Sequence, residues 1–161
     1  MAEVQAYSEK VMRANLSKLP DGEYTGEDFT DGLRLGDEHI PIRVRVTIAG
    51  DEATVDLSES ADQVGGPINA PVASTRSAVY TFFVNMMSRG TPVNDGSYRP
   101  ITVIARKGSI CNPHFPAPVR SRMATCYRIM TTLKHAFANA SSDLVAAAGD
   151  DSTNSVAFAY Q

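Results

Sequence analysis

One run of strictly alternating residues limits the folds that this chain can adopt. Over residues 40–48 every second residue is apolar, and the alternation resumes over 53–57 after the pair Gly50 and Asp51. A period of two predicts strands that each bury one face, and a two-residue Gly-Asp loop predicts a hairpin. With this loop, the antiparallel register pairs Ile48 with Ala53, Val46 with Val55 and Val44 with Leu57. All apolar partners then share one face, whereas a slip of one residue would expose one strand's apolar set to water.

The same register sets the polar face of the hairpin. Arg45 falls opposite Asp56, and we expect these side chains to form a cross-strand ion pair on the solvated side. Residues 23–31 alternate weakly around Tyr24 and Phe29 and are rich in acidic residues. Clustered carboxylates can hold Mg²⁺ or Ca²⁺, but the stretch does not fit a calcium loop. A solvated strand edge and loop is therefore favoured, and we predict no metal site.

Three other stretches follow the helical period of about 3.6 residues. Residues 1–19 carry an approximate apolar stripe before a Pro-Asp-Gly stop, which predicts an N-terminal helix. A long helix is predicted over about 71–88, with Val72, Val79, Phe82, Phe83, Met86 and Met87 on its buried side. A second is predicted over about 118–140, with Val119, Met123, Cys126, Met130, Leu133 and Phe137 as its seam. A rigid, proline-punctuated linker, residues 111–118, precedes it.

These elements place the chain in the α+β class. We expect an antiparallel or mixed sheet that includes the hairpin at about 40–58, with the two long helices packed on it and an N-terminal helix. Residues 101–105 are apolar on both faces except for Thr102, which predicts an interior strand, and 156–160 alternate as a last strand. The chain 1–161 is interpreted as one domain, made of the helix 1–19, a lobe over 23–110 and a final part over 111–161.

Composition excludes several classes of function. With 43% hydrophobic and 20% charged residues, a net charge of -3 and a pI near 5.6, the chain is globular. It has no electrostatic reason to bind nucleic acid or an anionic membrane surface. No apolar run is long enough to span a bilayer and the start lacks a signal-peptide pattern, so the expected compartment is the cytoplasm. Cys111 and Cys126 have no CxxC spacing and are interpreted as reduced thiols.

The loop between the hairpin and the first long helix is the first candidate site. Residues 65–71 read Gly-Gly-Pro-Ile-Asn-Ala-Pro and lead directly into the helix. Unpaired backbone N–H groups and the helix dipole at such a start can bind an anion or a polar ligand. The alternative, which the residues alone favour, is that Asn69 or a neighbouring carbonyl only closes the turn and that Pro71 lies in the first turn.

Two arginines stand where the second long helix is expected to begin. Arg120 and Arg122 would lie in its first turn, where cations oppose the helix dipole. They either pair with Asp or Glu elsewhere or form an anion clamp for a carboxylate or phosphate. The three histidines, His39, His114 and His135, show no HxH or HExxH spacing, and the chain has no Walker-type motif and no GxGxxG after a strand. Residues alone therefore predict a domain without a self-sufficient active site.

Six short phrases stand in a characteristic order along the chain. They are Leu-Pro-Asp-Gly-Glu-Tyr-Thr-Gly-Glu-Asp at 19–28, Ile-Pro-Ile-Arg-Val at 40–44, Gly-Pro-Ile-Asn-Ala-Pro at 66–71, Thr-Arg-Ser-Ala-Val-Tyr at 75–80, Tyr-Arg-Pro-Ile at 98–101 and Asn-Pro at 112–113. Together they resemble the hydantoinase B/oxoprolinase family, which serves ATP-dependent N-methylhydantoinases, 5-oxoprolinases and ketone carboxylases. The resemblance covers most of the chain from about residue 16 and implies a carboxy-terminal portion of a longer chain.

The resemblance implies a function for a whole assembly rather than for this chain alone. That function is hydrolysis of a cyclic amide such as a hydantoin or 5-oxoproline, with ATP used by a partner hydantoinase A-type subunit or domain. An ATP-dependent ketone carboxylase is the related alternative. ATP and a divalent metal are implied for the assembly, and no cofactor is implied in this chain. The implied partners are that subunit, in an oligomer, and a small-molecule substrate, and the isolated chain is expected to be inactive.

The same resemblance selects residues for a candidate site. The loops 65–71 and 94–100 are its most family-specific parts, and the substrate-binding residues implied are Asn69, Arg76, Asn94 and Arg99. Two other hypotheses stay open. One is a non-catalytic assembly domain whose helices and strand build a subunit interface. The other is a free-standing binder of a small ligand through the Asn69 and Asn94 loops.

Overall fold

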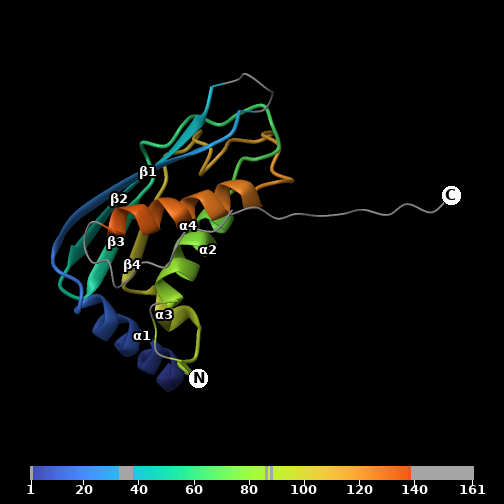
Figure 1. The fold of residues 1–161 in the computed structure, drawn as a ribbon. Helices are drawn as coiled ribbons and strands as arrows, with labels where there is room; N and C mark the ends of the chain where they lie inside the picture. The colour runs from blue at the N-terminus through green and yellow to red at the C-terminus, as the bar shows by residue number, and fades with distance from the viewer. Residues whose placement is uncertain (1, 33–37, 86, 88, 139–161) are drawn as a thin grey trace.

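The computed structural model describes residues 2–32, 38–85, 87 and 89–138 of the 161-residue chain. Its elements, in chain order, are α1 (Ala2–Leu16), β1 (Gly22–Thr30), β2 (Ile40–Ala49), β3 (Glu52–Asp56), α2 (Val72–Val84), α3 (Asp95–Tyr98), β4 (Ile101–Ile104) and α4 (Met123–Ala138). The four described strands form one sheet in the order β1-β2-β3-β4, antiparallel except for the parallel pair of β3 and β4. The α+β class with a mixed sheet is confirmed (Figure 1). The last strand expected at 156–160 lies outside the described residues.

The predicted hairpin register is confirmed over its central pairs. Ile48 pairs with Ala53, Val46 with Val55 and Arg45 with Asp56. The ladder ends there, because Leu57 lies just past β3 and its N–H donates to the Ile104 carbonyl of β4 at 2.9 Å. The alternating apolar residues of both strands, Leu57 included, are buried on one face as expected, except that Ile40 at the start of β2 is half-buried. The alternation thus determines which face of the sheet meets the core.

The predicted ion pair between Arg45 and Asp56 is wrong, although the two residues are opposite each other. Arg45 pairs with Glu59 at 2.8 Å and with Glu23 at 3.4 Å. The Asp56 carboxylate instead accepts a hydrogen bond from the Ser58 N–H at 2.8 Å. A short aspartate side chain readily bonds the backbone two residues on, whereas a long arginine reaches the neighbouring strand. The stretch 23–31 is a strand at the sheet edge, as predicted.

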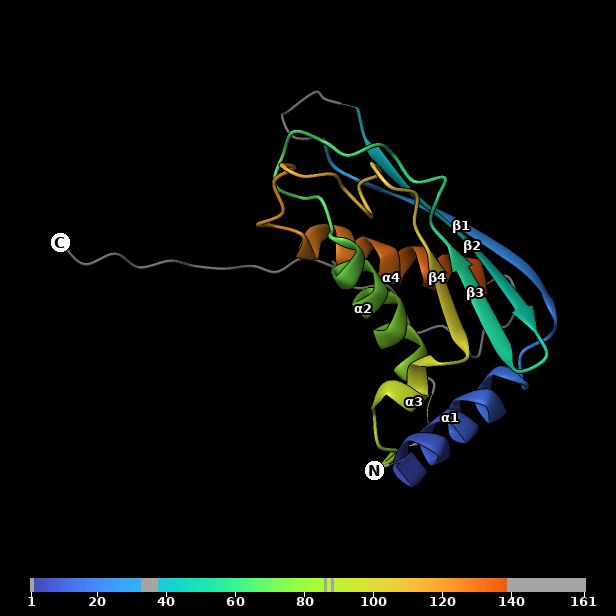
Figure 2. The ribbon, with the colours of Figure 1, turned by 180° about the vertical axis from the view of Figure 1, so that it is seen from behind.

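The core lies between the apolar face of the sheet and α4. α4 packs across β1 and β2, and α2 packs beside α4 (Figures 1 and 2). The closest approach is at Gly26 of β1, where a Cβ would overlap the Thr132 carbonyl oxygen of α4. Glycine at this position therefore lets the helix reach the strand. Beside it, the rings of Tyr24 and Phe82 stack on Phe137 with centroids 5.6 and 5.4 Å apart.

Three predicted elements have different bounds or a different place. α2 ends at Val84 rather than near 88, although apolar residues continue the helical pattern beyond it. α4 begins at Met123 rather than near 118, and just before it the Ser121 N–H donates to the Pro67 carbonyl of the loop 65–71 at 2.8 Å. β4 is an edge strand rather than an interior one: β3 is its sole neighbour among the described strands, and Ile104 is 43% exposed. Apolar residues on both faces of a strand do not show whether another strand pairs with its edge.

The predicted N-terminal helix is α1, which lies at one end of the sheet against α3 (Figure 2). Arg13 ties it to the hairpin turn through ion pairs with Asp51 and Glu52, both at 3.1 Å. α3 sits directly on α1, since a Cβ at Gly96 would overlap the Gln5 carbonyl. None of the helices in the described part of the chain is long and apolar enough to cross a membrane.

The linker and the two cysteines behave as the sequence predicts. Residues 111–118 contribute no helix or strand element. Cys111 and Cys126 are free thiols in the interior. Burial raises the pKa of the Cys111 thiol to about 12. Burial also raises the pKa of Cys126, and the nearby positive charge of Arg122 works in the opposite direction.

Candidate functional site

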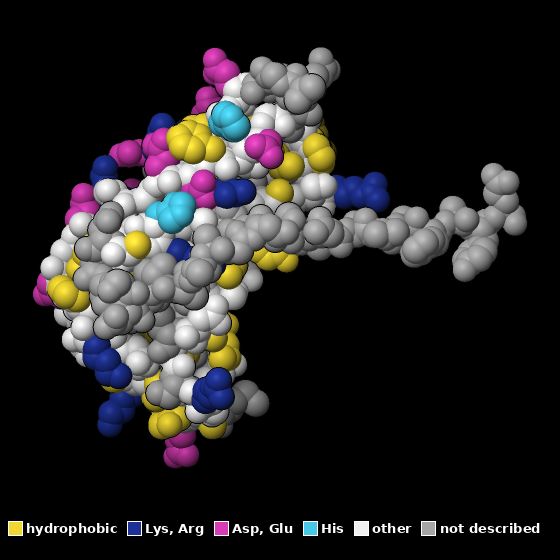
Figure 3. Space-filling model, viewed as in Figure 1, with side chains coloured by type: hydrophobic (Ala, Val, Ile, Leu, Met, Phe, Trp, Pro, Cys, Tyr) yellow, Lys and Arg dark blue, Asp and Glu magenta, His cyan; other side chains and the backbone are white. Residues whose placement is uncertain are grey.

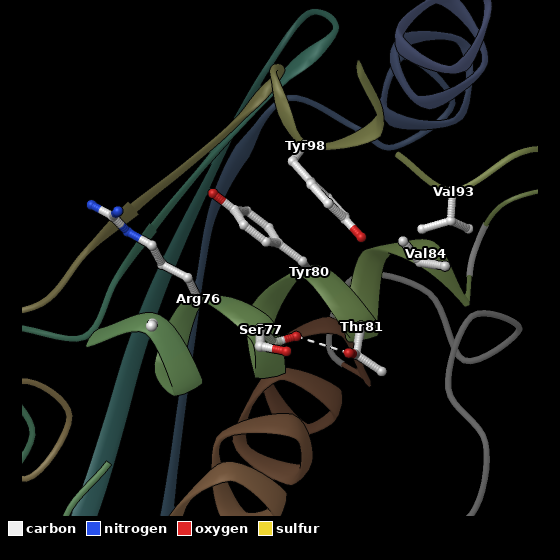
Figure 4. A pocket seen from close by; sticks show the side chains of 8 residues that line it. Arg76, Ser77, Tyr80, Thr81, Val84, Val93 and Tyr98 are labelled. Atoms are coloured by element: carbon white, nitrogen blue, oxygen red, sulfur yellow. Dashed lines mark hydrogen bonds between the residues drawn. The ribbon is translucent and has the colours of Figure 1, made fainter. Parts of the chain in front are cut away.

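A groove beside α2 is the candidate site (Figure 4). It has a volume of about 430 Å³ and lies between α2, α3 and the segment that joins them. Its lining residues are Ala73, Arg76, Ser77, Tyr80, Thr81, Val84, Val93 and Tyr98. The α2 residues among them recur every three or four positions, so they form one side of the helix.

Two stacked tyrosines form one wall of this groove. The ring centroids of Tyr80 and Tyr98 are 4.4 Å apart, and the ring planes differ by 13°. Tyr98 belongs to α3, which begins with a capping box. In this box the Asn94 side chain accepts from the Gly96 N–H at 2.9 Å, and the Ser97 hydroxyl accepts from the Asn94 N–H at 3.5 Å. The capping box therefore holds the short helix that positions one ring of the pair.

Arg76 supplies the charge of the groove. Its side chain is exposed and makes no hydrogen bond or ion pair with any residue that the structure describes. Figure 4 shows Arg76 one helical turn before Tyr80. In the same groove the Thr81 hydroxyl donates a hydrogen bond to the Ser77 carbonyl at 2.8 Å. None of the lining residues is His, Asp, Glu or Cys. The groove can bind a carboxylate, a phosphate or a planar group, but it has no general base and no activated nucleophile.

Asn69 faces the interior rather than a ligand. It is fully buried, and its Oδ1 accepts from the Val64 N–H at 2.9 Å. Its Nδ2 donates to the carbonyls of Val64, Gly66 and Pro118 at 2.8, 2.9 and 3.0 Å. All hydrogen-bonding groups of the amide are thus used inside the protein. Asn69 closes the loop 65–71, as the residues alone favour, and ties it to the linker before α4. It does not cap α2, because Pro71 is the N-cap residue rather than part of the first turn and no side-chain hydrogen bond caps this helix.

Asn94 and Arg99 connect α3 to α1. The Asn94 Nδ2 donates to the Ser8 hydroxyl at 2.9 Å. Arg99 pairs with Glu9 of α1 at 3.1 Å and with Asp95 at 3.4 Å. Of the four residues that the family resemblance selects, Arg76 is the one that lines the groove. The others hold the elements around it in place.

Arg120 and Arg122 precede α4 instead of lying in its first turn, because the helix begins at Met123. Both are exposed, and neither forms an ion pair within the described residues. The pairing with Asp or Glu that would explain them is therefore absent from that part of the chain. Arg122 lines a second groove of about 460 Å³ between α2 and α4.

The acidic stretch of β1 is neutralised by arginines. Glu27 pairs with Arg43 at 2.6 Å and Asp28 with Arg128 at 2.9 Å. Among the described residues, no group of three or more His, Cys, Asp or Glu side chains could hold a metal ion. The part of the chain that the structure describes thus offers no site for the divalent metal implied for the whole assembly, and the sequence has no Walker-type motif for ATP. No step through either group is assigned to this chain.

Comparison with known proteins decides the family. The family model described as Hydantoinase B/oxoprolinase matches residues 1–161. The chain belongs to the hydantoinase B/oxoprolinase family. It is 39% identical over 170 residues to a protein of Pseudomonas sp. (strain NS671) named as one of the subunits of a D-/L-hydantoinase, a match that covers 99% of this chain and 28% of the relative. It is 34% identical over 119 residues to the beta subunit of caprolactamase from Pseudomonas jessenii, covering 73% of this chain and 20% of the relative.

Solved structures share the fold of this hydantoinase B/oxoprolinase chain. The crystal structure of ATP-dependent caprolactamase from Pseudomonas jessenii matches with a TM-score of 0.79 and 29% identity, over 88% of this chain and 25% of that chain. Nucleotide-free acetone carboxylase matches with a TM-score of 0.69 and 15% identity, over 83% and 20%, which shows a common fold alone. The chain thus spans between 20% and 28% of the length of these relatives.

Tyr80 and Tyr98 belong to two of the short motifs that resemble the family, at 75–80 and 98–101, but the sequence did not identify them as site residues. Tyr80 follows Arg76 by four residues, and this helical spacing alone indicates that the two share a face. Tyr98 has no comparable signal, because its contact with α2 depends on how α3 packs against α1. The stacked pair is therefore a product of the tertiary structure.

Proposed function

We propose that this chain is a portion of an ATP-dependent enzyme that hydrolyses a cyclic amide, such as a hydantoin or 5-oxoproline. The observation that carries the proposal is the match to ATP-dependent caprolactamase, which extends over 88% of this chain. Relatives named as a D-/L-hydantoinase component and as the 5-oxoprolinase of Saccharomyces cerevisiae support it. The names of all three denote opening of a ring amide. In this proposal ATP is used by a partner hydantoinase A-type subunit, and the assembly works in the cytoplasm.

Within the assembly, the chain supplies structure and an interface rather than the reacting groups. This part of the proposal is supported by the contacts of three candidate residues: Asn69, Asn94 and Arg99 all bond inside the protein. The groove beside α2 has no base or nucleophile among its lining residues. Arg76 keeps a guanidinium that no described residue neutralises, so it is the group best placed to meet a carboxylate.

The test uses the complete polypeptide that contains this chain together with its hydantoinase A-type partner. ATP hydrolysis is measured with and without hydantoin, 5-oxoproline and caprolactam, and the ring-opened product is followed by mass spectrometry. We expect at least one ring amide to stimulate ATP hydrolysis. A folded, complete assembly that turns over none of them, but carboxylates a ketone in the presence of ATP and bicarbonate, would establish the carboxylase alternative instead.

A further inference from the structure

The exposed side of α2 differs from an ordinary solvent-facing helix surface. Arg76 is the sole charged residue among the 13 residues of this helix. Its most exposed line is made of the small residues Ala73, Ser77 and Thr81, spaced four apart. They form a low ridge about 12 Å long, at 1.5 Å per residue. A helix that faces water usually carries a charged outer side, so the composition of α2 is that of a helix covered on this side as well.

Grooves flank this ridge on both sides. The first is the groove of about 430 Å³ beside α3, and the second is the groove of about 460 Å³ beside α4. Both are lined by Ala73, Ser77 and Thr81, so the ridge and its two grooves form one continuous surface, which we call the α2 face. Val93 in the first groove is 52% exposed, and Met123 in the second is 43% exposed. A ridge between two grooves is a shape against which another helix packs.

The arginines of the α2 face make no ion pair within the described residues, whereas most other described arginines do. The arginines that form ion pairs are Arg13, Arg43, Arg45, Arg99, Arg106 and Arg128. Those without an ion pair in the described part of the chain are Arg76, Arg89, Arg120 and Arg122. Arg76 lines the first groove and Arg122 the second. A guanidinium without an ion pair on each side of a ridge of small residues favours carboxylates in whatever covers it.

The charge of the chain is divided in the same way. Residues 63–161, which contain α2 and α4, hold nine Lys and Arg and four acidic residues, Asp95, Asp143, Asp150 and Asp151. Residues 1–62 hold fourteen acidic and six basic residues. In Figure 3 a group of Lys and Arg atoms projects on the side where α4 begins, and the acidic side chains visible on this face lie mainly over the side of the sheet. The half of the chain that contains the α2 face therefore carries more basic than acidic residues.

We propose that the α2 face binds an acidic α-helix of a partner polypeptide. Small and apolar residues of that helix pack over the ridge and into the grooves, and its carboxylates pair with Arg76 and Arg122. A second copy of this chain is a poorer occupant, because the carboxylates on its described helices are Glu3, Glu9 and Asp95, and the last two already pair with Arg99. The inference goes beyond the proposed reaction, since it rests on the shape and charge of this face alone.

Two synthetic peptides of 18 residues test the proposal on the full chain. Both present the same Ala and Leu face, and their polar face is Glu in one and Lys in the other. By fluorescence anisotropy, we expect the Glu peptide to bind at least about tenfold more tightly than the Lys peptide, with an affinity that falls as salt is added. Arg76→Glu and Arg122→Glu should each weaken binding of the Glu peptide at least about fivefold. The matched control, Lys107→Glu, changes an exposed residue outside both grooves and should stay within about twofold.

A second measurement locates the peptide without any charge reversal. Cys126 lines the second groove, whereas Cys111 lines neither. The bound Glu peptide should therefore slow alkylation of Cys126 and leave the rate at Cys111 unchanged. The milder variants Arg76→Gln and Arg122→Gln serve if a charge reversal disturbs folding. Equal affinity for both peptides, no binding at millimolar peptide, or an unprotected Cys126 would overturn the proposal, as would a dimer of the chain that Arg76→Glu dissociates.

Discussion

Replacing Asn69 by Ala separates a structural role of this residue from a role in substrate binding. The side chain is fully buried and makes four hydrogen bonds, one accepted from Val64 and three donated to Val64, Gly66 and Pro118. The alanine variant keeps the Cβ and loses all four. It also leaves the Val64 N–H and the three carbonyls without their partner in a site with little access to water.

The expected loss follows from these contacts. An internal hydrogen bond contributes about 1 kcal/mol net, and a buried group left without a partner costs about 1–3 kcal/mol. The Nδ2 atom shares two hydrogens among three carbonyls, so the three bonds it donates count for less than three separate ones. We therefore expect Asn69→Ala to lower the free energy of unfolding by about 3 kcal/mol. Asn69→Asp should give no rescue, because a carboxylate keeps the acceptor and places negative charge against three carbonyl oxygens.

The assay is urea unfolding followed by far-ultraviolet circular dichroism. The matched control is Asn112→Ala in the neighbouring linker, where the amide makes one side-chain hydrogen bond, to the Ala105 carbonyl at 3.0 Å. The control should lose about 1 kcal/mol. In the complete enzyme, turnover per folded assembly should be unchanged in Asn69→Ala. A variant as stable as the unmodified chain, with turnover abolished, would refute the reasoning.

Three further perturbations test other contacts. Gly26→Ala pushes a methyl group into the backbone of α4 and should lower the free energy of unfolding by about 1–3 kcal/mol, measured by urea unfolding. Hydrogen bonds from Arg99, and secondly from Arg13, hold the pKa of the Glu9 carboxyl below its usual value. The ion pair of Glu9 with Arg99 therefore stabilises the fold at pH values above the unfolded pKa of about 4.3. This stabilisation is lost as the pH falls through the pKa of the folded state. The melting temperatures of Arg99→Ala and the unmodified chain should therefore differ near neutral pH and converge in acid. Peptide mapping after iodoacetamide treatment at pH 8 should show both thiols reacting far more slowly than in urea, because burial raises the pKa of Cys111 to about 12 and raises that of Cys126.

Each of these has a control or an outcome that contradicts it. Gly65→Ala is the matched control for Gly26, since a Cβ at Gly65 meets nothing within 4 Å, and an equal loss in both variants would argue against the steric explanation. If the difference in melting temperature between Arg99→Ala and the unmodified chain stays constant from neutral to acid pH, the ion pair with Glu9 does not explain the effect of Arg99. Thiols that react as fast in the folded chain as in urea would show that they are not buried.

The parts of the fold that the sequence predicts well depend on local periodicity. The hairpin register follows from the period of two and the two-residue loop, because these decide which side chains share a face before any tertiary contact forms. The long helices follow from the period of 3.6, although their ends do not. α4 starts at Met123 and α2 ends at Val84. These ends depend on local contacts near each terminus, and the spacing of apolar residues does not predict those contacts.

The ion-pair partners of long polar side chains are not predicted by local periodicity. Arg45 lies opposite Asp56 as predicted, yet it pairs with Glu59 and Glu23, which come from a following loop and from β1. The choice depends on which carboxylates other elements bring within reach. The edge position of β4 is similar, since Ile104 would look the same in sequence whether or not another strand lay beside it.

For the candidate site, the sequence by itself determined the family, the face of α2 that carries Arg76 and the class of each element. The tertiary structure alone decided that Asn69 points inward, that the rings of Tyr80 and Tyr98 stack, and that Arg76 and Arg122 stand on opposite sides of one ridge. The reason is physical: periodicity is a property of neighbours along the chain, whereas hydrogen-bond satisfaction, ring stacking and charge pairing depend on residues that only folding brings together.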